Sequence, residues 1–172
     1  TYEDTNADVS NLISEEGLIF SDPMNMDKTT YSSAHKKCWH TDSGKTDDVW
    51  LQIDLGKSYD VASAYIWNLN QQAANGTAYP ERDSKDIEIY YTEDETAETW
   101  EKLGQYTIAQ TPGDAKARTA DLIVPVEKKA RYIKIAIKKI KMKYKFLHSM
   151  KKKVLYLYYI INIKIIINLL KH

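Results

Sequence analysis

Two short runs of β-favouring residues, joined by a polar turn, constrain the fold of this chain more than any other feature. The first run, residues 50–55, places Leu51, Ile53 and Leu55 on one face and Trp50, Gln52 and Asp54 on the other. This period of two predicts a strand with one buried face. Gly56, Lys57, Ser58 and Asp60 then supply the turn residues of a tight connection.

The second run, residues 61–69, predicts a central strand, because a strand that is apolar on both faces is buried on both. Its faces carry Val61, Tyr65 and Trp67 on one side and Ala62, Ala64 and Ile66 on the other. We expect Trp50, Trp67 and Trp100 to lie in or against the core.

Further strands are expected at residues 17–20, 86–92, 100–109, 119–124 and 131–137. Residues 131–137, RYIKIAI, alternate regularly between polar and apolar side chains. Gly104 interrupts the strand that contains it. Long polar loops at residues 21–48 and 71–86 separate these runs, and no segment has the apolar period of an amphipathic helix. The pattern predicts an all-β protein, an antiparallel β-sandwich.

The charge distribution divides the chain into two compositions. Residues 1–137 hold all 24 acidic residues and 14 of the 24 basic ones, a net charge of about −10. A nucleic-acid-binding domain normally presents a basic face, so no nucleic acid is expected as a partner. We therefore take residues 1–137 as the β-sandwich domain and residues 138–172 as a separate Lys/Ile-rich tail.

The tail contains ten Lys and seven Ile but no Gly, Pro, Asp or Glu, and without turn residues it does not read as a sheet. Three interpretations stay open: translation of A/T-rich DNA in a shifted frame, a membrane anchor over residues 154–170, and a basic partner-binding segment. The anchor would be shorter than the typical span of about 20 residues, and Lys164 within it would cost roughly 2.5–3.5 kcal/mol.

Catalytic patterns are weak. The single cysteine, Cys38, excludes an internal disulfide and a Cys-rich metal site. With His35 and His40 it forms an H-x-x-C-x-H cluster, but no fourth zinc ligand or orienting partner is placed near it. No glycine-rich phosphate loop is present. We assign no catalytic residue and expect no enzymatic activity.

The motifs CWHTDSG, WLQIDLGKSYDVASAYIWNLNQ, ERDSKDIEIYY and RYIKIAI, in this order, resemble the discoidin, or coagulation factor V/VIII type C, domain family. Its bacterial members include family 32 carbohydrate-binding modules. The resemblance implies a galactose-binding-like, eight-stranded jelly-roll sandwich with ligand loops at one end, usually non-catalytic. Two departures stand out: Asp83 follows Arg82 where the family usually has Gly, and no counterpart of the last strand is visible after Ile137.

A sugar site needs aromatic faces that stack on the pyranose ring and planar polar groups that bond to adjacent hydroxyls. The two long loops and the neighbouring strand ends provide the candidates His35, Trp39, His40, Asn68, Asn70, Tyr79 and Arg82. Alternatives are a core position for Trp39, a strand-end backbone bond for Asn68 and a loop-anchoring role for Tyr79. Asn70 and Arg82 favour ligand contact.

The family often holds a structural calcium near the start of the fold. Calcium prefers several oxygen ligands on a kinked loop, and here Asp22, Asn25, Asp27 and Thr30 could supply them. A solvated acidic turn is the alternative interpretation of the same residues.

These observations predict a non-catalytic carbohydrate-binding module that targets a larger secreted or surface protein to glycans, galactose-containing ones among them. The alternative is a protein- or phospholipid-binding adhesion module on the same fold. The chain begins at Thr1 without a signal peptide, so we expect it to be one piece of a larger multidomain, bacterial protein. A membrane is expected as a partner only if residues 154–170 form an anchor.

Overall fold

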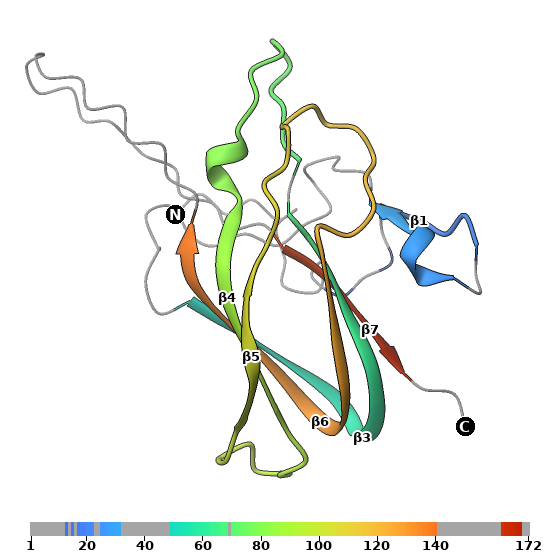
Figure 1. The fold of residues 1–172 in the computed structure, drawn as a ribbon, viewed down its shortest axis with the longest axis vertical. Helices are drawn as coiled ribbons and strands as arrows, with labels where there is room; N and C mark the ends of the chain where they lie inside the picture. Colours follow the sequence, from blue (N-terminus) through green and yellow to red (C-terminus); the bar gives the residue numbers. More distant parts are fainter. Residues whose placement is uncertain are drawn as a thin grey trace, which may run out of the picture.

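The computed structural model describes residues 13, 15, 17–22, 25–31, 49–68 and 70–140, together with the backbone of residues 163–169. Strands dominate these residues (Figure 1). They are β1 (Leu18–Ile19), β2 (Thr30–Tyr31), β3 (Val49–Asn68), β4 (Ser84–Thr92), β5 (Glu101–Thr107), β6 (Leu122–Ile140) and β7 (Ile163–Leu169). Two 3-10 turns, η2 (Met26–Lys28) and η3 (Pro80–Arg82), complete the described elements.

The strands form two antiparallel sheets. β1 pairs with β2, and the other five strands form a sheet of order β5-β4-β6-β3-β7. The predicted all-β, antiparallel architecture is confirmed.

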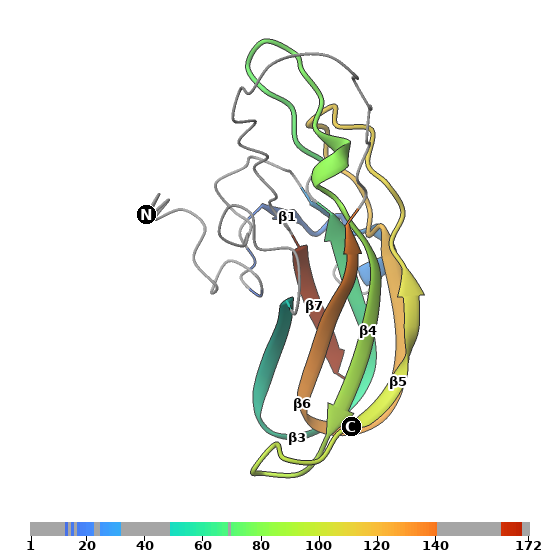
Figure 2. The ribbon, with the colours of Figure 1, turned by 90° about the vertical axis from the view of Figure 1, so that its left-hand side faces the viewer.

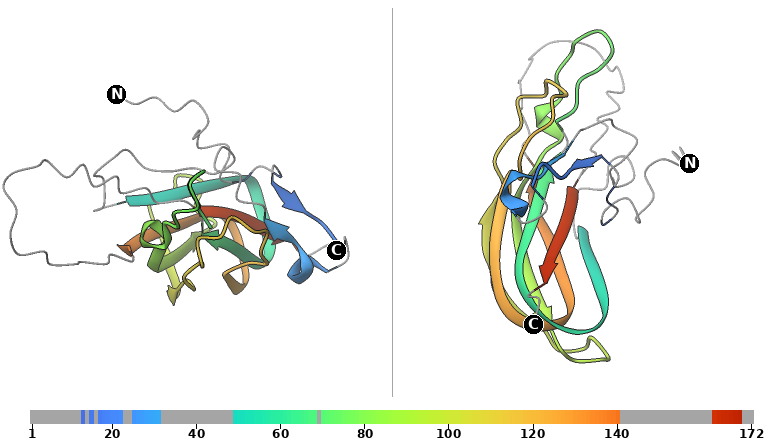
Figure 3. Two further views of the ribbon diagram at one scale, coloured as in Figure 1. Left: turned by 90° about the horizontal axis from the view of Figure 1, so that it is seen from above. Right: turned by 90° about the vertical axis from the view of Figure 1, so that its right-hand side faces the viewer.

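The larger sheet makes both layers of the sandwich because β3 and β6 bend back on themselves (Figure 2). Their pairing is interrupted between Asp54 and Tyr59, where Gly56 adopts a φ of 83°. Glycine takes this left-handed conformation without the penalty that a Cβ brings. The first half of β3 lies in one layer with β4 and β5, and its second half lies in the other layer beside β7 (Figure 3).

The core lies between the two layers. The first layer contributes alternate residues of β3, β4 and β6, and the second layer contributes residues from the other halves of β3 and β6. Ile108, the residue that follows β5, completes the core. The full set is Val49, Leu51, Ile53, Val61, Ala64, Ile66, Ile87, Ile89, Ile108, Val124, Val126, Ala130, Ile133, Ile135 and Ile137. The alternation predicted for residues 50–55 is confirmed, since Leu51 and Ile53 are buried and Gln52 is exposed.

Two pairs of predicted strands are continuous in the structure. Residues 50–55 and 61–69 belong to β3, and residues 119–124 and 131–137 largely belong to β6. The turn residues predicted at 56–60 bend β3 across two layers instead of ending a strand, and β6 likewise continues through residues 125–130. At Gly104 the strand also continues, with a register shift against β4 next to it.

The predicted face of Val61 is wrong. Val61 lies in the main core with Ala64 and Ile66, whereas Tyr65 and Trp67 form a second cluster with Tyr31. The pairing of β3 shifts register between Val61 and Ser63 on both of its neighbours. Such an irregularity changes the phase of the alternation, which a strict period of two cannot anticipate.

The tryptophan predictions hold for one residue and fail for another. Trp67 is 1% exposed and lies in the second cluster, whereas Trp50 is 54% exposed on the outer face of the first layer. Trp50 alternates with buried residues, so its position follows from the same pattern that buries Leu51. Trp100 is partly buried just before β5, with its ring close to Lys134.

The tail takes part in the sheet. β6 continues to Ile140, beyond the expected boundary at residue 137, and β7 pairs with the second half of β3. Residues 163–169 are therefore strand, so the run 154–170 is not a continuous helix. β7 is rich in Ile, a residue that favours strands, and needs no turn of its own to join an existing edge. No helix within the described residues is long and apolar enough to cross a membrane.

Candidate functional site

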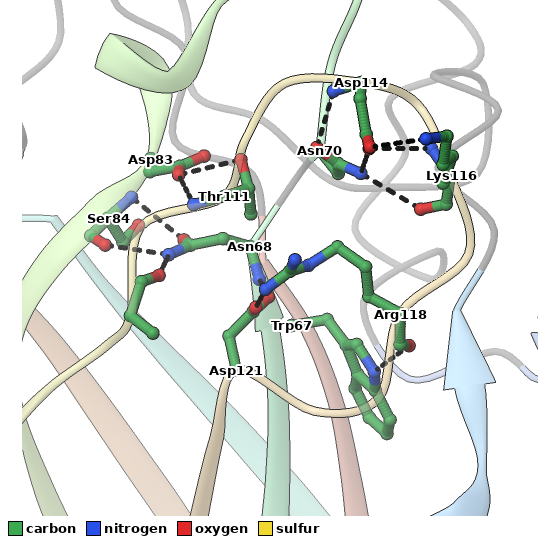
Figure 4. A network of polar contacts seen from close by, with 11 residues as sticks. Trp67, Asn68, Asn70, Asp83, Ser84, Thr111, Asp114, Lys116, Arg118 and Asp121 are labelled. Carbon is green, nitrogen blue, oxygen red and sulfur yellow. Dashed lines mark hydrogen bonds and ion pairs between the residues drawn. The ribbon is translucent and has the colours of Figure 1, made fainter.

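Two loops meet at the end of the sandwich opposite the bend of β3 (Figure 1). One runs from residue 70 through η3 into β4, and the other connects β5 to β6 over residues 108–121. Buried polar side chains join the two loops to the end of β3 (Figure 4). We call these loops the 70–83 loop and the 108–121 loop.

Asn68, the last residue of β3, ties three segments together. Its amide nitrogen donates to the carbonyl oxygens of Ser84 and Ala109 at 3.0 Å each, and its amide oxygen accepts from the Ser84 N–H at 3.0 Å. The side chain is 2% exposed. Both amide donors are used internally, so the structure places Asn68 in the scaffold, the alternative noted for it.

Asn70 has a similar position at the 108–121 loop. Its amide nitrogen donates to the Asp114 carboxylate at 2.6 Å and to the Lys116 carbonyl at 3.0 Å, and its oxygen accepts from the Asp114 N–H. The hydrogen bond from the Asn70 side chain lowers the pKa of Asp114, and the hydrogen bond from the Lys116 N–H lowers it further. Asn70 is 2% exposed and both of its donors are used, so it shapes the loop rather than the outer surface.

Asp83 takes the position where the resemblance leads us to expect glycine. Its φ of −69° and ψ of 140° are ordinary extended values, so this backbone does not require glycine. One carboxylate oxygen accepts from the Thr111 N–H at 2.7 Å and from its hydroxyl at 3.0 Å. Asp83 is fully buried, and it fastens the start of β4 to the 108–121 loop.

Gly113 lets the two loops touch. Its φ is 69°, and a Cβ at this position would lie 2.7 Å from the Ala78 Cβ and 3.2 Å from the Gln71 carbonyl oxygen. Any larger residue would push the 108–121 loop away from the 70–83 loop. The sequence predicts a turn at Pro112-Gly113, but it does not show that this turn lies against Gln71 and Ala78 of the 70–83 loop.

The second cluster is joined to this network through Trp67. Its indole N–H donates to the Arg118 carbonyl at 3.1 Å, and the Arg118 guanidinium pairs with Asp121 at 2.6 Å. The other Asp121 oxygen accepts from the Asn68 N–H at 2.9 Å. The 108–121 loop therefore holds the end of β3 through Trp67 and Asn68.

Arg82 and Tyr79 form the partly exposed part of this end. The Arg82 guanidinium lies 4.2 Å from the centre of the Tyr79 ring and donates to the Gln71 side-chain oxygen at 2.8 Å. Stacking on an aromatic face and a fork of donors are both properties of arginine that lysine lacks. We call Gln71, Tyr79 and Arg82 the rim.

The structure brings four of the seven predicted ligand residues to this end: Asn68, Asn70, Tyr79 and Arg82. His35, Trp39 and His40 lie outside the described residues. Sequence reasoning missed Gln71, Asp83, Thr111 and Asp114. Gln71 carried a signal as the neighbour of the candidate Asn70, and Asp83 as a departure from the family's glycine. Neither signal gave the role of the residue, because pairing across two distant loops leaves no local pattern.

The four predicted calcium ligands lie close together in the chain around η2, but each makes contacts of its own. Asn25 caps η2 by accepting from the Asp27 N–H, and Asp22 pairs with Lys28 at 3.4 Å. One Asp27 oxygen accepts from the Tyr65 hydroxyl at 2.8 Å. Thr30 pairs with Ile19 in the small sheet.

These contacts are those of a hydrogen-bonded acidic turn, the alternative held open for this segment. Among the described residues, no three His, Cys, Asp or Glu side chains gather as metal ligands. Calcium binding stays a prediction.

Tyr65→Phe should reduce the loss of stability at alkaline pH. Burial of the hydroxyl, the larger cause, and its hydrogen bond to Asp27, the smaller cause, raise the pKa of Tyr65 from 10.0 to about 12. Between pH 10 and 12 the folded state keeps the hydroxyl proton of Tyr65, whereas the unfolded state releases it. The contribution of Tyr65 to the free energy of unfolding is therefore complete below pH 10 and is lost as the pH rises through 12.

The difference amounts to about 2–3 kcal/mol by pH 12. We expect urea unfolding at pH 8 and pH 11.5 to show a smaller alkaline loss for Tyr65→Phe than for the unsubstituted chain. Equal losses would contradict the raised pKa of Tyr65 in the folded state. Absorbance titration of tyrosinate provides an independent check, because the variant should lack the titration step nearest pH 12.

The antiparallel jelly-roll sandwich, with polar loops gathered at one end, is the architecture of galactose-binding-like domains. The model of the F5/8 type C domain matches residues 21–150. The chain belongs to this family, and the resemblance found in its motifs is confirmed. No curated protein sequence matches the chain.

Solved structures support the fold. A fragment of a protein assigned as a chitobiase from Bacteroides thetaiotaomicron superposes with a TM-score of 0.57 at 17% identity, covering 98% of this chain and 79% of that one. A family 32 carbohydrate-binding module of a family 31 glycoside hydrolase, bound to N-acetylgalactosamine, gives a TM-score of 0.51 at 12% identity, with 98% and 90% covered. At these identities the likeness establishes the fold alone.

Proposed function

We infer that this domain is a non-catalytic carbohydrate-binding module that holds a larger secreted or surface protein on glycans. The observation that carries this inference is the rim: Arg82 is stacked on Tyr79 and bonded to Gln71 at the end of the sandwich. A guanidinium fork and an amide can bond to adjacent hydroxyls of one sugar, and an aromatic ring can cover its apolar face.

The scaffold beneath the rim supports binding because it is rigid. Asn68, Asn70 and Asp83 fix the two loops with buried hydrogen bonds, so little ordering is required when a ligand arrives. The family 32 module with a TM-score of 0.51 was solved with N-acetylgalactosamine, which makes a galactose-type sugar the first ligand to test.

Three carboxylates of the two loops, those of Asp83, Asp114 and Asp121, are held by hydrogen bonds or an ion pair. A general acid at neutral pH needs a raised pKa, whereas the pKa of Asp114 is lowered. Asp121 is paired with Arg118 and the Asn68 N–H, and Asp83 holds Thr111. These groups serve the scaffold, which agrees with a module that binds and does not transform its ligand.

Arg82→Ala should weaken binding of N-acetylgalactosamine and galactosides by roughly 10- to 100-fold, the worth of charge-assisted hydrogen bonds. Isothermal titration calorimetry and a glycan array measure this loss. Arg131→Ala is the matched control, because Arg131 pairs with Asp54 and Glu95 near the bend, at the opposite end of the sandwich.

Retained sugar binding in Arg82→Ala would remove this residue from the site. Loss in both arginine variants would point to a general defect, which near-ultraviolet circular dichroism would reveal. Indifference of the unsubstituted chain to every glycan, together with binding to liposomes, would replace the glycan proposal with the adhesion alternative.

A further inference from the structure

The outer face of the first layer carries an exposed aromatic residue that the core does not explain. Trp50 is 54% exposed and lies on β3 opposite Ala136 of β6. Gln52, the next residue on this face, is exposed and lies opposite Lys134. A single exposed apolar side chain needs no explanation, whereas a contiguous group of them marks an interaction surface. Here a second ring, that of Trp100, lies near the same lysine as Trp50.

Lys134 lies between two tryptophan rings. Its ammonium is 4.8 Å from the centre of the Trp50 ring and 5.3 Å from the centre of the Trp100 ring. The Trp100 ring is held in place because its N–H donates to the Ala97 carbonyl at 2.9 Å. None of the ion pairs among the described residues includes Lys134, whose ammonium lies against the two ring faces.

The neighbouring charges leave this face positive. Glu88 of β4 pairs with Lys102 at 2.6 Å and with Lys138 at 3.0 Å, so one carboxylate serves two ammonium groups. Tyr90, opposite Lys134 in the sheet, donates its hydroxyl to the same carboxylate at 2.7 Å. Asp54, at the bend end of the face, is paired with Arg131, which also pairs with Glu95 at 3.6 Å. Around the exposed ring, the three lysines Lys102, Lys134 and Lys138 therefore outnumber the single carboxylate of Glu88.

We propose that this face, defined by Trp50, Lys134 and Trp100, is a second glycan-binding surface, specific for saccharides that carry a carboxylate or sulfate group. The Trp50 ring stacks on a sugar ring, and Lys134 pairs with the anionic substituent. Charge complementarity favours an acidic saccharide at this surface, because a neutral sugar bound over Lys134 would cover the ammonium without pairing with it. The surface is separate from the rim and does not depend on it.

Affinity electrophoresis and calorimetry with polygalacturonate, dextran sulfate and neutral dextran test the proposal. The full chain should bind at least one acidic polymer and not dextran. Binding of polygalacturonate alone identifies the carboxylate as the recognised group, and binding of dextran sulfate alone identifies the sulfate. Trp50→Ala should weaken this binding roughly tenfold, as expected for a central aromatic contact. Lys134→Gln should weaken it by a few-fold, with a smaller dependence on salt.

Two controls separate this surface from general attraction of polyanions. Lys57→Gln is the matched control, because Lys57 lies over the Tyr59 ring at 5.1 Å but belongs to the bend. Trp50→Ala changes no charge, so its effect cannot arise from the ten lysines of residues 138–172.

No binding of either acidic polymer would overturn the proposal. So would unchanged binding by Trp50→Ala, or equal weakening by Lys57→Gln and Lys134→Gln. Arg82→Ala should bind the acidic polymer normally while losing N-acetylgalactosamine, which keeps this test distinct from that of the rim.

Discussion

Replacing Trp67 with alanine is expected to lower the free energy of unfolding by about 3–5 kcal/mol, the usual cost of removing a large buried aromatic side chain. Trp67 is 1% exposed and its ring centre lies 6.3 Å from that of Tyr65 in a stacked arrangement. Its N–H also satisfies the Arg118 carbonyl at 3.1 Å. The substitution removes packing in the second cluster and leaves that carbonyl without its indole donor.

Trp50→Ala is the control for this prediction, because it deletes the same side chain from an exposed position. Urea unfolding should place its effect within about 0.5 kcal/mol, as for other surface substitutions. If the two variants were equally stable, the second cluster would not be the packed unit that joins the small sheet to the 108–121 loop. Measuring both variants at one pH keeps protonation out of the comparison.

Asn68→Ala should cost about 3 kcal/mol or more of unfolding free energy, since an unsatisfied buried polar group costs about 1–3 kcal/mol. The substitution leaves the Ser84 N–H and the Ser84 and Ala109 carbonyls without the partner that Asn68 provides. All three contacts lie where the two loops meet β3, so local opening should begin there. Hydrogen exchange should show the largest loss of protection at the Ser84 amide.

Asn75→Ala provides the comparison, because Asn75 is exposed and makes a single turn bond to the Thr77 N–H. Its cost should stay below about 1 kcal/mol. A similar cost for Asn68→Ala would mean that water replaces the lost bonds and that the loops are not fixed by this side chain.

Much of the candidate site could be located from the sequence, but the roles of its residues could not. The loops were identified from their turn residues, and two of the candidate ligand residues, Tyr79 and Arg82, lie in contact at the rim. Asn70 was expected to meet a ligand and instead gives both amide donors to the 108–121 loop. That loop is more than 40 residues away along the chain, and amide chemistry suits both uses equally well.

Local patterns were enough to predict most of the strands, the buried face of residues 50–55 and the family, because alternation and turn residues are properties of short segments. They did not predict β2, β7 or the face of Val61. Tertiary structure alone decided that β3 and β6 each pass through both layers, since a glycine turn in a single chain does not reveal whether a strand ends or bends. It also decided which polar residues are buried in the scaffold and which remain at the rim. That choice depends on partners brought together only when the two loops close over the end of β3.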